Sequence, residues 1–418
     1  MRLSLTGTPP RSRPGELRFT ACFGDASQSC AQLESIAQPE QDLGLAACQL
    51  VSTSDWPEFI DLSFAGIPER GRVFGRVSLS DIPHAAFCSD VIGSGDRAVE
   101  AGVQLLRTRP GPSLSQANVH FSATVLRDGQ VVVAGGGRAI ADVFSPATET
   151  FRPIDLVVPR RWHAAALLND GRVLIAGGAA PGSPYGSMPR VEALDIVSGK
   201  SSLLPSMEIP RAGLSATVLA DGRVFAAGGT DAEIYEPDAG VWLPGGRLLT
   251  ARSFHTANLL PDGTVLLAGG WAADGHALAT TELFNPLTGT HAAGPPMQQG
   301  RARQVAITLL DASVLIAGGG GTSAERYVPD LHAFVPAGAL SVAEDDGCGT
   351  RLPSGQVVVV GENQLVHLYE PAQNRWYERA VLSQARRGCV TWPTPDGGVL
   401  VVGGYDRDYL SSSEVVEP

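Results

Sequence analysis

A motif that recurs seven times constrains the fold of this 418-residue chain more than any other feature. Its first copy, residues 126–136, reads LRDGQVVVAGG and ends on a pair of glycines. The first residue of each pair, or of its counterpart in the sixth copy, follows a turn residue by seven positions. These first residues are Gly135, Gly177, Gly228, Gly269, Gly318, Gly361 and Gly403. They lie 41 to 51 residues apart, and such a period is typical of supersecondary units that stack on their neighbours.

Two local signals in each repeat predict β-strands joined by tight turns. The turn position holds aspartate in six copies and Ser354 in the sixth, and an Asp-Gly pair favours a hairpin turn because both residues tolerate positive φ. After the diglycine, a ring is followed two positions later by proline and seven positions later by another bulky residue. This set recurs as Phe144/Pro146/Phe151, Tyr235/Pro237/Trp242, Phe284/Pro286/His291, Tyr327/Pro329/Phe334 and Tyr369/Pro371/Trp376. The proline predicts a turn between the third and fourth strands, with the rings packing between sheets.

Each repeat is therefore expected to form a four-stranded sheet, and sheets of this length stack radially as propeller blades. The 49 glycines and 30 prolines also favour many short strands over long helices. The second copy, around residues 194–201, lacks the aromatic pair, and the sixth has Gly361-Glu362 in place of the diglycine. We expect these two blades to be irregular but present.

The repeats over residues 98–418 resemble the kelch repeat, with its diglycine and its spaced Tyr and Trp in four-stranded blades. This resemblance implies an all-β, seven-bladed propeller similar to the central domain of galactose oxidase, and the chain as a whole is similar to multi-domain bacterial surface proteins. The seventh copy ends at residues 416–418, where its fourth strand should begin. Residues 101–109 have strand character, and we expect them to supply that strand and close the ring, which removes an exposed edge.

Residues 1–97 lack the repeat, and their alternating stretches between Pro and Gly turns predict a small immunoglobulin-like β-sandwich. We therefore expect two domains, 1–97 and 98–418. Four cysteines in the first domain suggest disulfides in an oxidising compartment, the alternative being buried free thiols. They are Cys22, Cys30, Cys48 and Cys88. No charged-then-apolar signal precedes this segment, so an extracellular or cell-envelope location requires a signal upstream of Met1; the alternative location is the cytoplasm.

The charge and apolar patterning restrict the partners. The formal net charge is −12, which disfavours nucleic acid and anionic membrane surfaces because both attract basic faces. No apolar run approaches the ~20 residues of a membrane span. We expect a monomer without a transmembrane segment.

Two charged positions recur once per blade. An arginine lies three residues before the inner strand in five copies: Arg160, Arg211, Arg252, Arg301 and Arg386. An acid lies two residues before the third-strand ring in six: Asp142, Glu192, Glu233, Glu282, Glu325 and Glu414. In the sixth copy Glu344 replaces the arginine and His367 replaces the acid. This joint replacement predicts structural ion pairs between loop and strand; the alternative is an arginine ring that binds carboxylate or sulfate.

No catalytic or metal-binding signature stands out in the sequence. GxSxG, HExxH and P-loop motifs are absent. His163 and His255 occupy one repeat position near the axis, where two histidines can approach one another, but a packing role is the simpler interpretation. Glu344-Asp345-Asp346 forms an acidic cluster that we interpret as a solvated loop in preference to a calcium site. We therefore predict no catalytic residue, no metal and no cofactor.

Aromatic and basic residues on loops predict a binding surface. The two long intervals arise in residues 179–190 and 271–280. The candidate ligand-binding residues are Arg161, Trp162, Tyr185, Trp271, His276 and Arg303.

These residues indicate non-enzymatic recognition of a protein or glycan on the propeller loop face. The alternative is a carbohydrate-active enzyme, oxidase-like or mutarotase-like, at the channel mouth. In the copper radical oxidases that share this propeller, the site needs a Cys-linked Tyr, a second Tyr and two His. One of those histidines comes from a domain after the propeller, so we do not expect a copper site here.

Overall fold

The computed structural model describes residues 108–182 and 186–417 in full, and before them only the backbone of seven strands. The chain divides into two compact units whose main boundary lies between Arg107 and Thr108.

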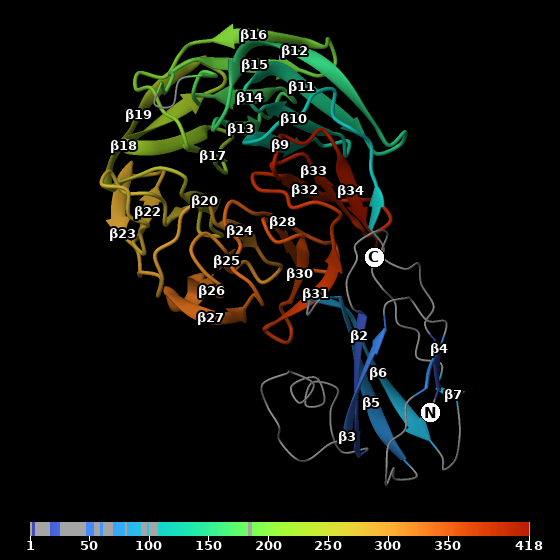
Figure 1. The fold of residues 1–418 in the computed structure, drawn as a ribbon. Helices are drawn as coiled ribbons and strands as arrows, with labels where there is room; N and C mark the ends of the chain where they lie inside the picture. The colour runs from blue at the N-terminus through green and yellow to red at the C-terminus, as the bar shows by residue number, and fades with distance from the viewer. Residues whose placement is uncertain are drawn as a thin grey trace. The chain divides into compact units, whose positions relative to one another are not determined.

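The second unit is a ring of seven antiparallel sheets, and the prediction of an all-β, seven-bladed propeller is confirmed. Figure 1 shows the inner strands gathered around the axis and the outer strands at the rim. Blades one to three contain β9 (Phe121–Val125), β10 (Val131–Gly135), β11 (Arg138–Ser145), β12 (Thr150–Arg160), β13 (Ala164–Leu167), β14 (Val173–Ala176), β15 (Val191–Asp195), β16 (Lys200–Leu204), β17 (Ser215–Val218), β18 (Val224–Glu236) and β19 (Val241–Arg252). In blade three the second and third strands run together as β18.

The remaining blades follow the same order from axis to rim. Blades four to six contain β20 (Thr256–Leu259), β21 (Val265–Ala268), β22 (Thr281–Asn285), β23 (Thr290–Ala293), β24 (Val305–Thr308), β25 (Val314–Ala317), β26 (Ser323–Val328), β27 (Ala333–Ala339), β28 (Cys348–Arg351), β29 (Val357–Val360), β30 (Leu365–Glu370) and β31 (Arg375–Val381). Blade seven contains β32 (Val390–Pro393), β33 (Val399–Val402), β34 (Ser413–Val416) and β8 (Thr108–Pro110). Among the described residues the one helical element is a 3-10 turn, η1 (Pro329–Leu331).

The irregular repeats still form blades. Leu194 and Ser201, which replace the ring pair in blade two, lie opposite each other in β15 and β16. The ring of strands is closed by β8, which pairs antiparallel with β34, and Arg109 lies opposite Val415. The closing strand expected over 101–109 thus spans residues 108–110, and residues 101–107 lie outside the described part of the chain.

The paired rings connect neighbouring blades. In all five ring pairs the two rings contact each other, with centroids 4.8 to 5.3 Å apart. Tyr235 and Trp242 of blade three pack against the apolar residues of blade two, and the Trp242 indole donates to the carbonyl of Pro205 at 2.9 Å. Trp376 likewise donates to Ala337 of the preceding blade at 2.8 Å. The rings therefore fill the space between sheets, as the sequence predicted.

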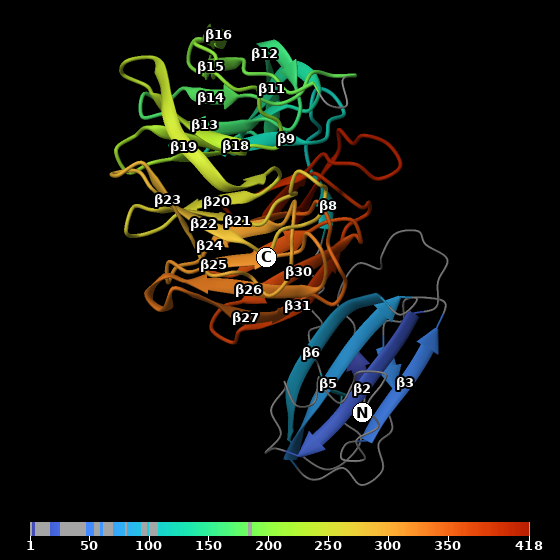
Figure 2. The same cartoon turned by 90° about the vertical axis from the view of Figure 1, so that its left-hand side faces the viewer.

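The described strands of the first unit form two sheets. Figure 2 shows the larger, an antiparallel sheet with strand order β3-β2-β5-β6. The smaller has strand order β4-β1-β7, in which β1 and β7 are parallel. These strands are β1 (Arg2–Ser4), β2 (Leu17–Asp25), β3 (Ala47–Thr53), β4 (Phe59–Asp61), β5 (Arg70–Leu79), β6 (Ile82–Ile92) and β7 (Ala98–Val99). Cys22 and Cys48 are direct register partners in β2 and β3, whereas side-chain pairing of these cysteines and of Cys30 and Cys88 lies outside the described residues.

An arginine before each of five inner strands joins three parts of its blade. Its guanidinium donates to the carbonyl of the first diglycine residue, 17 positions later, and also to the acid on the third strand. The acid–guanidinium distances are 2.8 to 3.3 Å. The five pairs are Arg160–Glu192, Arg211–Glu233, Arg252–Glu282, Arg301–Glu325 and Arg386–Glu414. We call this arrangement the arginine latch; its arginines are almost fully buried.

Close backbone packing explains the diglycine. A Cβ on Gly269 would lie 2.5 Å from the carbonyl oxygen of Arg301, in the loop that leads to the next blade. A Cβ on Gly270 would lie 2.7 Å from the carbonyl oxygen of Ser253, in the loop of its own blade. Both glycines also have positive φ. The pair therefore lets one strand end press against two inter-blade loops at once, which a side chain would prevent.

Blade six uses a similar latch in which the acid and the basic residue have exchanged places. Glu344 takes the arginine position and binds His367 on the third strand at 3.1 Å, with both residues 1% exposed. Its second oxygen accepts the backbone N–H of Glu362 at 2.8 Å, where the other blades offer a carbonyl to a guanidinium. Gly361 and Glu362 lack the positive φ of the other pairs. An anion needs a donor at this point, so the peptide presents its N–H and a non-glycine residue is tolerated.

Blade one has the acid without a guanidinium. Asn118 stands at the arginine position, and Asp142 accepts hydrogen bonds from the backbone N–H and hydroxyl of Ser115 at 3.3 and 3.0 Å. Burial raises the pKa of Asp142 despite these two hydrogen bonds.

A disulfide between Cys348 and Cys389 links the inner edges of blades six and seven. The sequence interpretation placed disulfides among the N-terminal cysteines and missed this one.

The latch predicts that neutralising its acid lowers the free energy of unfolding more than neutralising Asp142, the acid of blade one that has no arginine partner. Glu192→Gln leaves the buried Arg160 without a counter-charge, so we expect the free energy of unfolding to fall by about 3–5 kcal/mol. Asp142→Asn retains an acceptor for Ser115 and should cost about 1 kcal/mol or less. Urea unfolding followed by tryptophan fluorescence measures both, and equal losses would contradict the latch.

The disulfide predicts a second stability difference. Its cysteines are separated by 41 residues, and cross-linking a loop of that size stabilises a fold by about 2–4 kcal/mol. We expect Cys348→Ala/Cys389→Ala to be less stable than the parent by that amount. The difference should vanish when both proteins are unfolded with reductant, and its persistence would assign the loss to packing.

Candidate functional site

In all seven blades, one residue of the loop that leads into the inner strand has a left-handed backbone and lies one or two positions before that strand. These residues are His120 (φ 56°), Trp162 (55°), Gly213 (65°), Phe254 (55°), Arg303 (55°), Asp346 (55°) and Gly388 (62°). We call them the axial ring. Bulky side chains rarely adopt this conformation, which costs roughly 1–2 kcal/mol per residue relative to ordinary backbone. Clusters of such residues are typical of ligand-binding sites.

Backbone hydrogen bonds join the axial ring from blade to blade. Trp162 N–H donates to the His120 carbonyl at 3.2 Å, Gly213 to Trp162 at 2.8 Å, Phe254 to Gly213 at 2.6 Å and Arg303 to Phe254 at 2.9 Å. Gly388 donates to Asp346 at 2.6 Å, and His120 donates to Gly388 at 3.4 Å. Six of seven neighbours are linked in this way. Arg303 and Asp346, both within the described part of the chain, are linked by their side chains instead.

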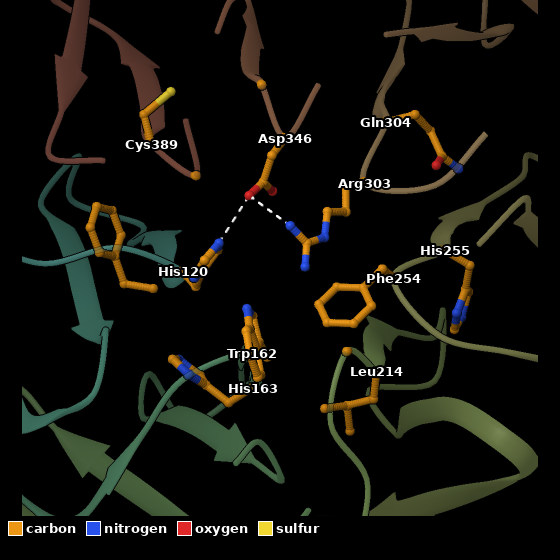
Figure 3. Close-up of a pocket in the computed structure, with 14 residues that line it drawn as sticks. His120, Trp162, His163, Leu214, Phe254, His255, Arg303, Gln304, Asp346 and Cys389 are labelled. Atoms are coloured by element: carbon orange, nitrogen blue, oxygen red, sulfur yellow. Dashed lines mark hydrogen bonds and ion pairs between the residues drawn. The ribbon is translucent and has the colours of Figure 1, made fainter. Parts of the chain in front are cut away.

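The side chains of the axial ring surround a cavity of about 240 Å³ on the propeller axis. Figure 3 shows His120, Trp162, Phe254, Arg303 and Asp346 turned toward a common centre. The residue that follows each axial-ring residue in the chain lines it as well: Phe121, His163, Leu214, His255, Gln304, Gly347 and Cys389. The axial ring thus forms the mouth, and these residues lie next to it, at or one position before the start of each inner strand.

Asp346 connects two basic residues across this mouth. Its Oδ2 lies 2.9 Å from His120 Nε2 and accepts from the Arg303 guanidinium at 3.2 Å. The Asp346 side chain is 15% exposed. Burial raises the pKa of Asp346, but His120, Arg303 and Arg387 outweigh burial and lower it. The carboxylate therefore stays ionised.

The aromatic residues of the mouth are held by cations and by each other. The Arg161 guanidinium lies 4.1 Å from the Trp162 ring centre, and that of Arg303 lies 4.7 Å from Phe254. Trp162 meets Phe254 edge-on, with centroids 5.8 Å apart. These contacts fix the rings, since cation–π and edge-to-face pairs each stabilise by about 0.5–1.5 kcal/mol.

Two histidines at the start of inner strands bind serines of the preceding blade. His163 Nε2 lies 2.9 Å from the Ser122 hydroxyl, and His255 Nε2 lies 2.9 Å from Ser215. Burial, reinforced by Arg160 or Arg252, lowers the pKa of each histidine to about 3. Such imidazoles are weak bases, and their Nδ1 atoms have no carboxylate partner in the structure. These Ser–His pairs therefore lack the features of an activated nucleophile.

The six candidate ligand-binding residues separate into three groups. Trp162 and Arg303 line the cavity, and Arg161 contacts Trp162. Trp271 is half-buried and its backbone pairs with Ser253, while His276 is exposed beside Asp274, away from the cavity lining. Tyr185 lies outside the described residues. Bridges of Arg161 with Ala179 and of Ser253 with Trp271 bring the long loops and the inter-blade loops to one face.

The interpretation of the acidic cluster as a solvated loop is wrong. Glu344 is buried in the blade-six latch, Asp346 holds the mouth, and Asp345 pairs with Arg387 at 2.9 Å. Each carboxylate contacts a different basic side chain, so the three do not face one ligand. Within the described residues no group of three His, Cys, Asp or Glu side chains is placed to hold a metal.

Sequence reasoning missed His120, Phe254 and Asp346 as residues of the mouth. They occupy one repeat position whose residue type changes in nearly every copy. The available signal was glycine at this position in copies three and seven, because Gly213 and Gly388 mark a backbone that requires positive φ.

The neutral buried histidines predict acid sensitivity. In the unfolded chain they titrate near 6.5, whereas in the folded protein the pKa values of His163 and His255 are about 3. Between these values only the unfolded state binds the protons. The contribution of the two histidines to the free energy of unfolding is therefore complete above pH 6.5 and falls as the pH decreases. The slope reaches up to about 1.4 kcal/mol per pH unit for each histidine.

We expect His163→Gln/His255→Gln, which places in both blades the residue that blade five has at Gln304, to reduce this slope between pH 6.5 and 5. Urea unfolding at several pH values measures it. Equal slopes for parent and variant would show that other groups cause the acid sensitivity.

The comparisons with known proteins agree with this architecture. No protein-family model matches the chain. An alignment over 195 residues, which covers 44% of the chain, shows 26% identity to Kelch-like protein 23 from Mus musculus and spans 34% of that protein. Among solved structures, a fungal alcohol oxidase of the AA5 family in complex with copper superposes with a TM-score of 0.62 and 16% identity. That match covers 74% of this chain and 76% of the oxidase.

The cavity donors do not fit copper. Its histidines are bound to Asp346, Ser122 and Ser215, and no tyrosine is among the residues that line it. Copper(II) sites need several convergent nitrogen and oxygen ligands.

Within the described residues, no helix is long and apolar enough to cross a membrane. The repeats, the sheet order and the two similarities together establish a seven-bladed β-propeller of the kelch type.

Proposed function

We propose that this propeller is a non-enzymatic recognition module that binds a protein or glycan partner on the face with the inter-blade loops. The axial ring carries the proposal. Five of its residues carry a side chain although the backbone there is strained. Glycine, which two blades have at this position as Gly213 and Gly388, would adopt the same conformation at a lower energetic cost. Those side chains include an arginine and two aromatic rings, the residue types that dominate binding energy at interfaces.

Exposed aromatic residues extend the proposed surface beyond the mouth. Tyr405 and Tyr409 are 41% and 53% exposed, and their rings meet edge-on at 5.9 Å. Tyr405 pairs through its backbone with Arg387, so it belongs to the same face as the mouth. The mechanism is rigid recognition: the partner meets preformed side chains and little loop ordering is needed.

We further propose an extracellular or cell-envelope location, and an organisation in which residues 1–97 form an immunoglobulin-like sandwich and residues 98–418 the propeller. The Cys348–Cys389 disulfide supports an oxidising compartment. The two sheets of the first unit support a small β-domain. We expect the protein to act as a monomer.

A second candidate is a mutarotase-like activity at the same mouth. It is favoured by the contact of His120 with Asp346, since a histidine–carboxylate pair in a cavity can exchange protons with a sugar hydroxyl. Anomer exchange of free sugars, followed by NMR with and without the protein, tests this candidate. Acceleration that is lost in His120→Gly would favour catalysis over recognition.

The recognition proposal predicts a separable loss of binding. Trp162→Gly/Phe254→Gly removes both rings and leaves the residue that other blades have at this position, so we expect an unchanged melting temperature within a few degrees. Binding to glycan arrays and to proteins captured from the cell envelope should fall about tenfold or more. Val197→Ser, at a fully exposed turn between β15 and β16, is the control. The same partners at the same levels with both variants would contradict the proposal.

A further inference from the structure

We propose that His120 and Arg303 form a receptor for a carboxylate side chain of an acidic protein segment, and that Asp346 fills this receptor when no partner is bound. This inference rests on the proposed recognition function and names the chemistry that the mouth recognises.

The geometry of Asp346 carries the proposal. Groups from blades one and five converge on one carboxylate oxygen, with His120 Nε2 at 2.9 Å and an Arg303 nitrogen at 3.2 Å. Two nitrogens that converge on one oxygen can hydrogen-bond another carboxylate oxygen that takes the place of Asp346 Oδ2. Further polar atoms at the mouth lack partners in the structure: His120 Nδ1, Trp162 Nε1 and Arg303 Nε. The mouth therefore contains buried nitrogen atoms whose hydrogen bonds Asp346 leaves unmade.

The charge around the mouth favours a replacement anion. His120, Arg303 and Arg387 all favour the ionised form of Asp346. Arg387 is also paired, with Asp345 at 2.9 Å and Glu362 at 3.4 Å. If Asp346 moves out, Arg303 loses its anion in a partly buried place, which is unfavourable unless another anion enters. Exchange of one carboxylate for another keeps the charge constant and requires no proton transfer.

The backbone allows this exchange. Every other pair of neighbours in the axial ring is joined by a backbone hydrogen bond, but Arg303 and Asp346 are joined by side chains. Asp346 can therefore leave Arg303 without breaking a bond of the ring. Its remaining ring bond, to Gly388 N–H, lies on the other side.

The aromatic faces favour a peptide side chain over a sugar. A sugar ring stacks on an open aromatic face, but Arg303 covers one face of Phe254. Gly213 packs against the Phe254 ring so closely that a Cβ would lie 2.8 Å from two ring atoms. Arg161 covers Trp162 at 4.1 Å. A slender aspartate or glutamate side chain fits between these groups without needing an open ring face.

The test removes the internal carboxylate from the full chain. Asp346→Gly leaves the residue found at two other ring positions, so the left-handed backbone is kept. We expect acetate to bind this variant about tenfold or more tightly than the parent, measured from the chemical shifts of the His120 imidazole. Adding Arg303→Gly should abolish the gain. Asp345→Asn, the neighbouring carboxylate on the same loop, should behave as the parent. If Asp346→Gly does not fold, Asp346→Asn should give a smaller gain in the same direction.

Each result has one meaning. No gain of acetate binding in a folded Asp346 variant overturns the receptor. A gain that survives Arg303→Gly overturns the assignment of Arg303. A capped Gly-Glu-Gly peptide should bind more tightly than glucuronate and than capped Gly-Gln-Gly; the opposite order overturns the protein segment in favour of an acidic glycan. Acetate binding is measured without a partner, so it can succeed while the capture experiment with Trp162→Gly/Phe254→Gly fails, which separates this inference from the recognition proposal.

Discussion

The arginine latch fixes the path of five of the seven loops that lead into the blades of this propeller. One guanidinium binds the carbonyl at the end of the second strand and the acid on the third strand, so the loop that carries the arginine has a fixed path. Buried ion pairs are weak evidence for stability by themselves because desolvation opposes the attraction. Here hydrogen bonds to backbone carbonyls accompany the ion pair, and the result is a defined loop geometry. Each latch arginine is followed two positions later by an axial-ring residue, as Arg160 is by Trp162. The latch therefore also fixes the position of that residue.

Blade six shows that the latch requires an acid and a basic residue that complement each other, and does not require an arginine at one fixed position. With Glu344 in place of arginine, the third strand supplies His367 and the backbone supplies the N–H of Glu362. An acid and a basic residue have exchanged places, and the loop still reaches the axis. The same blade lacks the backbone bond between Asp346 and Arg303, and the Asp346 side chain instead binds Arg303 and, beyond Gly388 in the ring, His120. The asymmetry of the mouth therefore originates where the repeat departs most from its pattern.

The blades could be predicted from the sequence because their signals repeat at fixed offsets. The turn residue, the diglycine, the ring pairs and the charged pairs each reflect a contact that every blade needs. The mouth could not be predicted in the same way, since its residues share a backbone conformation and not a chemical type: His120, Phe254, Arg303 and Asp346 look unrelated in an alignment of the repeats. The disulfide was missed because Cys348 and Cys389 hold neighbouring, not equivalent, positions in blades six and seven.

The contacts that hold the strained backbone of the mouth also make the mouth rigid. A left-handed tryptophan or phenylalanine persists only where the surroundings over-determine it, and here the latch on one side and the ring of backbone hydrogen bonds on the other provide that constraint. The side chains are therefore held in place before any partner arrives, which reduces the ordering cost of association. A catalytic cavity has a different requirement, titratable groups with pKa values near the working pH. The two inner-strand histidines, with pKa values of about 3, are far from that range. The fixed geometry supports the proposed recognition function, and the imidazoles of His163 and His255 do not meet the requirement for proton transfer.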